Sequence, residues 1–73
     1  MNKEISNLGL SAYLMVSGFQ LLQVKPSGRR SVFVFKDDGN IETESFRFFN
    51  KQVKCEPVSF WEALKTLKAM AEN

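Results

Sequence analysis

The stretch from residue 18 to residue 39, GFQLLQVKPSGRRSVFVFKDDG, constrains the fold more than any other part of the chain. Residues 19–25 and 30–36 are rich in apolar, β-branched and aromatic side chains, which favours two strands. The Pro-Ser-Gly sequence at 26–28 is typical of a turn, because Pro presets its own φ and Gly adopts a positive one. So short a connection predicts an antiparallel hairpin. The adjacent leucines at 21–22 indicate either partial cover on both sheet faces or a β-bulge.

The first helix is predicted at residues 8–17, LGLSAYLMVS, where apolar residues recur at spacings of three and four. Asn7 is a good N-cap for this helix. Gly18 is expected to end it, because glycine readily takes the left-handed conformation just past a helix end. Residues 1–6 are polar and show no such pattern, so we expect them to be a frayed lead-in.

A second helix is predicted at residues 41–50, after a turn that ends with Asn40 as a candidate cap. Glu42 and Glu44 in the first turn favour this helix, because carboxylates interact well with the positive end of the helix dipole. A strand is the competing interpretation of SFRFF at 45–49, where phenylalanines alternate.

The remaining segments predict a third strand and a third helix. Residues 51–56 alternate between polar and apolar side chains, which indicates a short strand ended by a proline. Ser59 followed by Glu62 forms a capping-box pattern, so the last helix is expected over residues 60–72.

Together these elements predict an α+β fold: a small three-stranded sheet with helices mainly on one face, in the order helix, strand, strand, helix, strand, helix. The length indicates a single small domain over residues 1–73, with an ordered core at about 7–71. Three strands leave two free edges and a lightly covered face, which are natural sites for self-association or a partner.

The composition argues against catalysis and metal binding. The chain has no His and a single cysteine, Cys55, so the commonest general base and metal ligand is missing and no internal disulfide can form. No Gly-rich phosphate loop or nucleophile–base pair is present. We therefore expect no enzyme activity, no cofactor and no metal. The polar N-terminus and short apolar runs predict a cytoplasmic protein without a membrane span.

The order of strands, turn and helices also carries a family resemblance. The residues involved are Ala12, Tyr13, Leu14, Gly18, Phe19, Leu21, Val24, Arg30, Val32, Phe33, Val34, Phe35, Asp37, Phe49, Asn50, Val53, Pro57 and the FWEALKTLK segment at 60–68. This pattern resembles DUF5659, a family of short prokaryotic and phage proteins of unknown function. The resemblance implies the fold and a bacterial, archaeal or phage setting, and it implies no activity.

A basic hairpin is the first candidate site. Lys25, Arg29, Arg30 and Lys36 could contact phosphates, in a mainly electrostatic and salt-sensitive way. The alternative interpretation is a solvated turn, because the acids at 37–38 reduce the local positive field and the net charge is only +2.

A second candidate site lies on the last helix. Trp61, Lys65 and Lys68 share one side of that helix and could form a partner contact or a stacking platform, with Phe46 as a weaker aromatic candidate. The alternative is a tryptophan at the edge of the core, shielded by lysine stems.

Two functions follow from these features. The first is a non-catalytic protein-interaction module that self-associates as a homo-oligomer or binds another protein. The alternative is a small nucleic-acid-binding protein that uses the basic hairpin.

Overall fold

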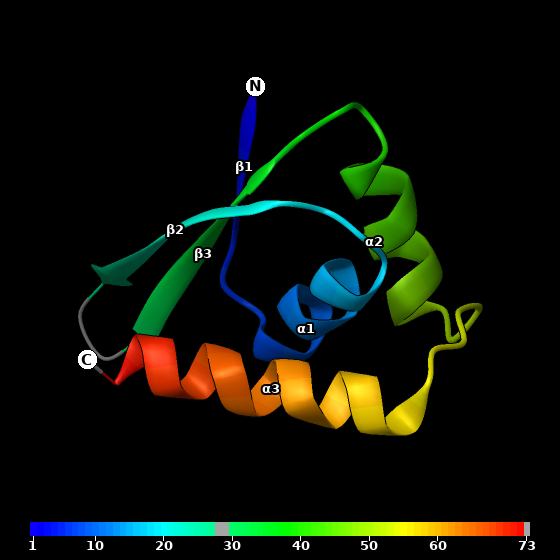
Figure 1. The fold of residues 1–73 in the computed structure, drawn as a ribbon. Coiled ribbons are helices and arrows are strands. Elements are labelled where there is room, and N and C mark those ends of the chain that lie inside the picture. Colours follow the sequence, from blue (N-terminus) through cyan, green and yellow to red (C-terminus); the bar gives the residue numbers. More distant parts are fainter. Residues whose placement is uncertain (28–29, 73) are drawn as a thin grey trace.

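The computed structural model describes residues 1–27 and 30–72 and confirms the α+β class. The strands lie in one antiparallel sheet in the order β1-β3-β2, and α1 lies between this sheet and α3, with α2 at its side (Figure 1). The sequence order is β-α-β-β-α-α, which differs from the predicted order at two places. The elements are β1 (Asn2–Ile5), α1 (Leu8–Val16), β2 (Leu21–Ser27), β3 (Arg30–Lys36), α2 (Ile41–Phe49) and α3 (Pro57–Ala71).

The N-terminal segment is a strand, and the expectation of a frayed lead-in is wrong. β1 pairs antiparallel with β3, where Lys3 lies opposite Phe35 and Ile5 lies opposite Phe33. Ile5 is buried in the core. A segment with so few apolar residues carries no periodic signal of its own. It becomes a strand because β3 offers it an unpaired edge.

The prediction of a strand at 51–56 is also wrong, because this segment is a loop. Lys51 has a φ of 60° just past the end of α2. The N–H of Gln52 then donates to the carbonyl of Arg47 at 2.9 Å, which is a helix-ending bond rather than a sheet bond. Cys55 is exposed, so the alternating pattern does not point it into the core.

The last helix begins two residues before the predicted cap. Pro57 is its first residue, a position that suits proline because the missing N–H has no helical partner there. The Glu56 carboxylate accepts a 2.7 Å hydrogen bond from the N–H of Ser59. Glu56 is therefore the N-cap, and Ser59 lies inside the first turn. Val58, which also lies in this first turn, is exposed.

The other helix limits are close to those predicted. The Asn7 side chain caps α1 by accepting from the N–H of Leu10 at 2.8 Å. Gly18 has a φ of 99° and ends α1. Residues 41–49 are helical, so the competing strand interpretation of 45–49 is wrong. Asn40 precedes α2, but its side chain makes no capping hydrogen bond.

The hairpin is confirmed, with its first strand displaced by two residues, from the predicted 19–25 to 21–27. β3 has the predicted bounds, and the register shifts between Leu21 and Gln23, which confirms the bulge. β2 continues through Pro26, which pairs with Ser31, so the proline belongs to a strand rather than to the turn. Gly28 and Arg29 lie outside the described residues.

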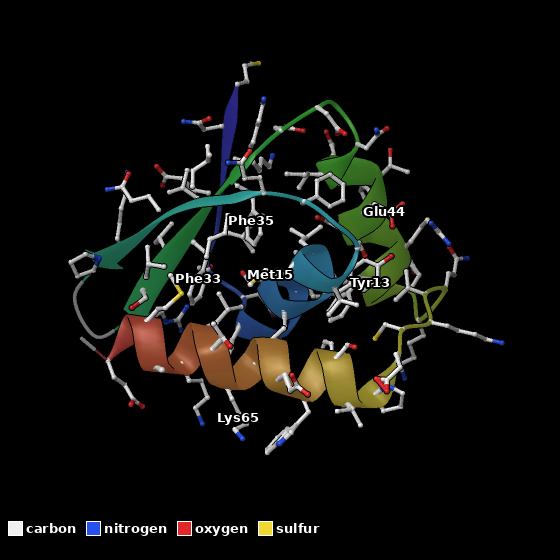
Figure 2. All side chains as sticks on the ribbon, viewed as in Figure 1. Tyr13, Met15, Phe33, Phe35, Glu44 and Lys65 are labelled. Carbon is white, nitrogen blue, oxygen red and sulfur yellow. The ribbon has the colours of Figure 1, made fainter. Side chains whose placement is uncertain are left out.

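One core joins the sheet to all three helices. Phe33 and Phe35 lie on the side of β3 that faces α1 (Figure 2), where they join Ile41 of α2 and Leu67 of α3. α1 has five consecutive buried residues, 10–14, as expected of a helix enclosed on all sides. The helices therefore cover one face of the sheet, as predicted.

Candidate interaction surfaces

The uncovered face of the sheet is crossed by an ion pair. Glu4 lies opposite Val34 and Lys25 lies opposite Val32, so both charged residues share the face that points away from the helices. Lys25 Nζ and Glu4 Oε2 are 2.9 Å apart, although β3 runs between their strands. Val34 is only 5% exposed on this open face. The ion pair thus covers the middle of the face with polar atoms.

Both edges of the sheet carry features that hinder the addition of another strand. β1 has only four residues and includes Lys3. β2 has the bulge after Leu21 and includes Pro26, which has no N–H to donate. Short edges, charges, bulges and prolines are the usual ways in which proteins block edge pairing. A partner is therefore favoured on a helix face over a strand edge.

The described residues of the basic hairpin do not gather at one point. Lys25 is paired with Glu4. Arg30 and Lys36 are both exposed, but they stand at opposite ends of β3. They are six positions apart along the strand, which corresponds to about 20 Å. Arg29 lies outside the described residues.

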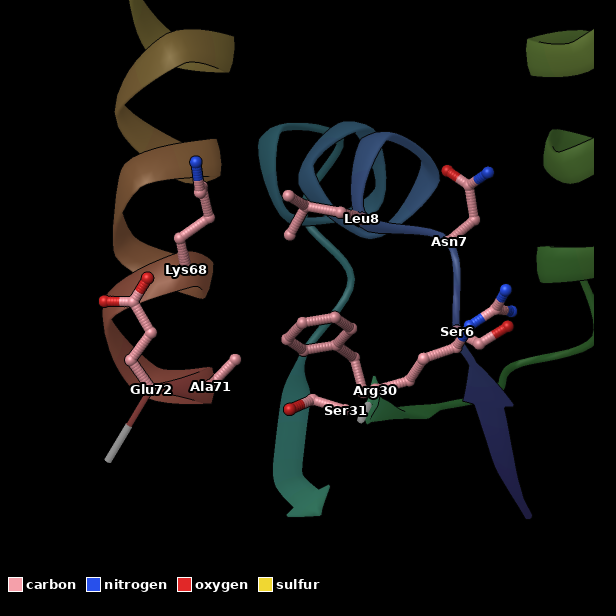
Figure 3. A pocket seen from close by; sticks show the side chains of 9 residues that line it. Ser6, Asn7, Leu8, Arg30, Ser31, Lys68, Ala71 and Glu72 are labelled. Atoms are coloured by element: carbon pink, nitrogen blue, oxygen red, sulfur yellow. The ribbon is translucent and has the colours of Figure 1, made fainter. Parts of the chain in front are cut away.

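Two residues from different predicted sites, Arg30 and Lys68, line the same surface hollow of about 580 Å³. Figure 3 shows Arg30 extending toward Ser6 on one side and Lys68 beside Glu72 on the other, with Leu8 between them. The two cations do not converge, and a carboxylate stands next to one of them. This hollow is therefore a poor site for a single anion.

Trp61 is exposed on the outer face of α3. Its side chain is 60% exposed, which contradicts the interpretation of a tryptophan at the edge of the core. Lys65 lies one turn further along the helix and points away from the core (Figure 2). Trp61 and Lys65 therefore lie on the same exposed side of α3. Lys68 lies further along, at the hollow described above.

A second exposed aromatic group lies on α2. Phe46 is 64% exposed and Phe49 is 58% exposed. Both line a hollow of about 300 Å³, together with Glu42 and Ser45 of α2 and Lys3 of β1. We call these five residues the α2 patch.

The sequence pattern identified only Phe46 in this patch. Phe48, next to Phe49, lies on the core side of the helix, and its ring centroid is 5.6 Å from that of Tyr13. The spacing of Glu42, Phe46 and Phe49 already placed them on one helix stripe. Lys3 was missed because its segment was not expected to be ordered.

The α2 patch contains one cation and one anion that form no ion pair with another described residue. Among residues 1–27 and 30–72, the ion pairs are Glu4 with Lys25 and Glu44 with Arg47. Lys3 and Glu42 border the same hollow, yet neither belongs to an ion pair.

A hydrogen-bond network holds α2 against α1. The Tyr13 hydroxyl donates to Glu44 Oε1 at 2.6 Å, and Arg47 donates to the other carboxylate oxygen at 2.9 Å. The pKa of Tyr13 is raised mainly by burial and, to a smaller extent, by the hydrogen bond to Glu44. The bonds from Tyr13 and Arg47 lower the pKa of Glu44. This network serves packing, and it fixes the helix that carries the α2 patch.

In the described part of the chain, no group of three or more His, Cys, Asp or Glu side chains is placed to hold a metal ion. Likewise, none of the described helices is long and apolar enough to cross a membrane.

The family described as Domain of unknown function (DUF5659) matches residues 2–73. The chain belongs to this family. In this DUF5659 chain, many of the residues that carried the resemblance lie in the core, as Tyr13, Leu14 and Phe35 do. No curated protein and no solved structure matches the chain.

Proposed function

We propose that this DUF5659 chain is a non-catalytic protein-interaction module that self-associates. The observation that supports this most strongly is the exposure of Phe46 and Phe49 side by side on α2. Large exposed apolar groups that adjoin one another on a small domain often mark an interaction site. Aromatic side chains are also enriched at protein interfaces.

Trp61 offers a second and separate surface. It lies on α3, whereas the α2 patch is built from α2 and β1. Trp is the residue type most enriched among interface hot spots, with Tyr and Arg. We assign the α2 patch to self-association and the Trp61 side of α3 to a different protein partner.

The α2 patch is the better choice for self-association because it combines apolar and charged groups of both signs. The Trp61 side carries Lys65, which would repel its copy across a symmetric contact. The prokaryotic or phage setting and the cytoplasmic location are part of the same proposal, supported by the family resemblance and by the single exposed cysteine.

The test is the molar mass of the protein in solution over a wide concentration range, by sedimentation equilibrium. We expect the wild type to form dimers reversibly. Phe46→Ser combined with Phe49→Ser should be monomeric, while Trp61→Ala, the matched loss of an exposed aromatic, should still dimerise. A wild type that is monomeric throughout would contradict the proposal. Circular dichroism checks that each variant is folded.

Nucleic-acid binding remains the second candidate, favoured by the exposure of Arg30 and Lys36 at the two ends of β3. Fluorescence anisotropy with DNA and RNA at low and high salt tests it. Binding that is lost in Arg30→Ala/Lys36→Ala, but kept in the ion-paired control Lys25→Ala, would support this function. The absence of binding at low salt would eliminate it.

A further inference from the structure

From the α2 patch we infer the geometry of self-association: two copies bind through this patch about a two-fold axis, with Lys3 of each copy paired with Glu42 of the other. This inference rests on the proposed self-association and adds the interface and its charge pairing. The α2 patch is self-complementary, which is the property that a two-fold interface requires.

The charged residues of the α2 patch can pair between two copies. Lys3 and Glu42 are both exposed, and they stand on different walls of the hollow, one on β1 and the other on α2. Neither forms an ion pair with any residue of 1–27 or 30–72. A two-fold axis that crosses the hollow sets the strand wall of each copy against the helix wall of the other. Each Lys3 then meets the Glu42 of the other copy, so the dimer contains two such ion pairs.

The two phenylalanines of the α2 patch form the apolar centre of the proposed contact. Phe46 and Phe49 follow Glu42 by four and seven residues, so the three side chains extend along one helix stripe of about 10 Å. The hollow of about 300 Å³ beside them can receive side chains of the second copy. The phenylalanines are thus covered at the centre while the ion pairs lie at the rim, which is the common arrangement of protein interfaces.

The charge balance favours a second copy over another occupant. An acidic segment would pair with Lys3 but repel Glu42, and a basic segment would do the reverse. A second copy presents one cation and one anion in the matching positions. The hydrogen bond from Tyr13 to Glu44 already joins α2 to α1 in the single chain, so this helix does not have to be ordered by binding.

Charge reversal tests the pairing. Lys3→Glu and Glu42→Lys should each weaken the wild-type dimer by at least about tenfold, because each creates two like-charge contacts in the dimer. The matched controls are Lys54→Glu and Glu62→Lys, which change the net charge equally at exposed positions outside the α2 patch. They should leave the dissociation constant within about threefold of the wild type.

Mixing the two single variants separates contacts between chains from contacts within a chain. A heterodimer of Lys3→Glu with Glu42→Lys restores both opposite-charge pairs, so it should form at least about tenfold more tightly than either variant alone. If residues 3 and 42 interacted only within one chain, mixing would not help, because each variant carries like charges at both positions. The exposed Cys55 lies outside the α2 patch and accepts donor and acceptor dyes, so energy transfer reports the heterodimer.

Each outcome has a distinct meaning. A wild type that never dimerises overturns the proposed self-association itself. A wild-type dimer that tolerates both reversals, or single variants that pair no better with each other than with themselves, overturns the Lys3–Glu42 geometry and leaves self-association standing. The inference is supported if the wild type dimerises, each charge-reversed variant dimerises more weakly, and the mixture of the two variants forms a tight heterodimer.

Discussion

Tyr13 and Glu44 are 31 residues apart in the sequence, yet the Tyr13 hydroxyl donates a 2.6 Å hydrogen bond to the Glu44 carboxylate. This bond joins the central helix α1 to the helix that carries the α2 patch (Figure 2). The pKa of Tyr13 is raised and that of Glu44 is lowered. The folded protein therefore favours the neutral phenol and the charged carboxylate.

The first prediction is a loss of stability at alkaline pH that depends on Tyr13. Because its pKa is higher in the folded than in the unfolded protein, its contribution is complete below about pH 10 and is lost as the pH rises through the folded pKa. Chemical denaturation at a series of pH values should show a shallower alkaline decline for Tyr13→Phe than for the wild type. Both proteins contain the same lysines, so any effect of the lysines on the alkaline decline is common to the two curves. Stability curves that decline in parallel at alkaline pH would contradict this account.

The second prediction concerns Glu44 and acid. Its lowered pKa means that its contribution is present above about pH 4 and is lost as the pH falls through the folded pKa. Glu44→Gln should therefore flatten the acid side of the stability profile, measured by thermal unfolding from neutral pH downward. The matched control Glu62→Gln, an exposed residue of α3, should keep the wild-type shape.

The third prediction is that β1 contributes to stability. Ile5→Ala removes a buried side chain from the core, so the free energy of unfolding should fall by about 2–4 kcal/mol in a urea titration. Asn2→Ala, an exposed change in the same strand, should have little effect. If both variants matched the wild type, the N-terminal segment would be a frayed lead-in after all.

The fourth prediction uses two helix ends of the same kind. After α1, the N–H of Gly18 donates to the carbonyl of Met15, and Gly18 has a φ of 99°. After α2, the N–H of Lys51 donates to the carbonyl of Phe48, and Lys51 has a φ of 60°. Both residues occupy the left-handed conformation that closes a helix.

Opposite substitutions should therefore have opposite effects. Gly18→Ala should lower the free energy of unfolding by about 1 kcal/mol, because a Cβ is strained at this φ although no atom obstructs it. Lys51→Gly should raise it by about 0.5 kcal/mol, since relief of strain exceeds the entropy that glycine adds to the unfolded chain. Differential scanning calorimetry measures both, and a destabilised Lys51→Gly would show that the lysine is not strained.

The fifth prediction distinguishes two candidate caps of α3. Glu56→Ala removes the acceptor of the Ser59 N–H and should cost about 0.5–1 kcal/mol of unfolding free energy. Ser59→Ala should be nearly neutral, because Ser59 contributes its backbone rather than its side chain. If urea titrations showed a larger loss of unfolding free energy for Ser59→Ala than for Glu56→Ala, Ser59 would be the N-cap instead.

Local signals account for the part of the fold that could be predicted. The Asn7 cap, the Gly18 helix end and the β-rich run of 30–36 depend on residues that are close together in the sequence, so their patterns are visible there. The predicted strand at 51–56 failed because alternation alone does not make a strand. Its first backbone groups are bonded to the end of α2 instead.

The candidate site was predictable only in part. Phe46 was found because an aromatic residue at the helix edge is visible in the sequence. Its neighbour Lys3 was not, since nothing in the sequence brings β1 beside α2. The basic hairpin shows the opposite error, because Lys25 looks free in the sequence but lies 2.9 Å from Glu4 in the fold.

The sequence by itself determined the α+β class, the hairpin and the positions of three helices, because short-range periodicity, caps and turn residues specify such elements. The tertiary structure alone decided that residues 2–5 complete the sheet and that Lys3 and Glu42 stand beside exposed phenylalanines. A strand is defined by the partner that accepts its hydrogen bonds, and a surface by which elements meet, and both depend on contacts between residues far apart in the chain.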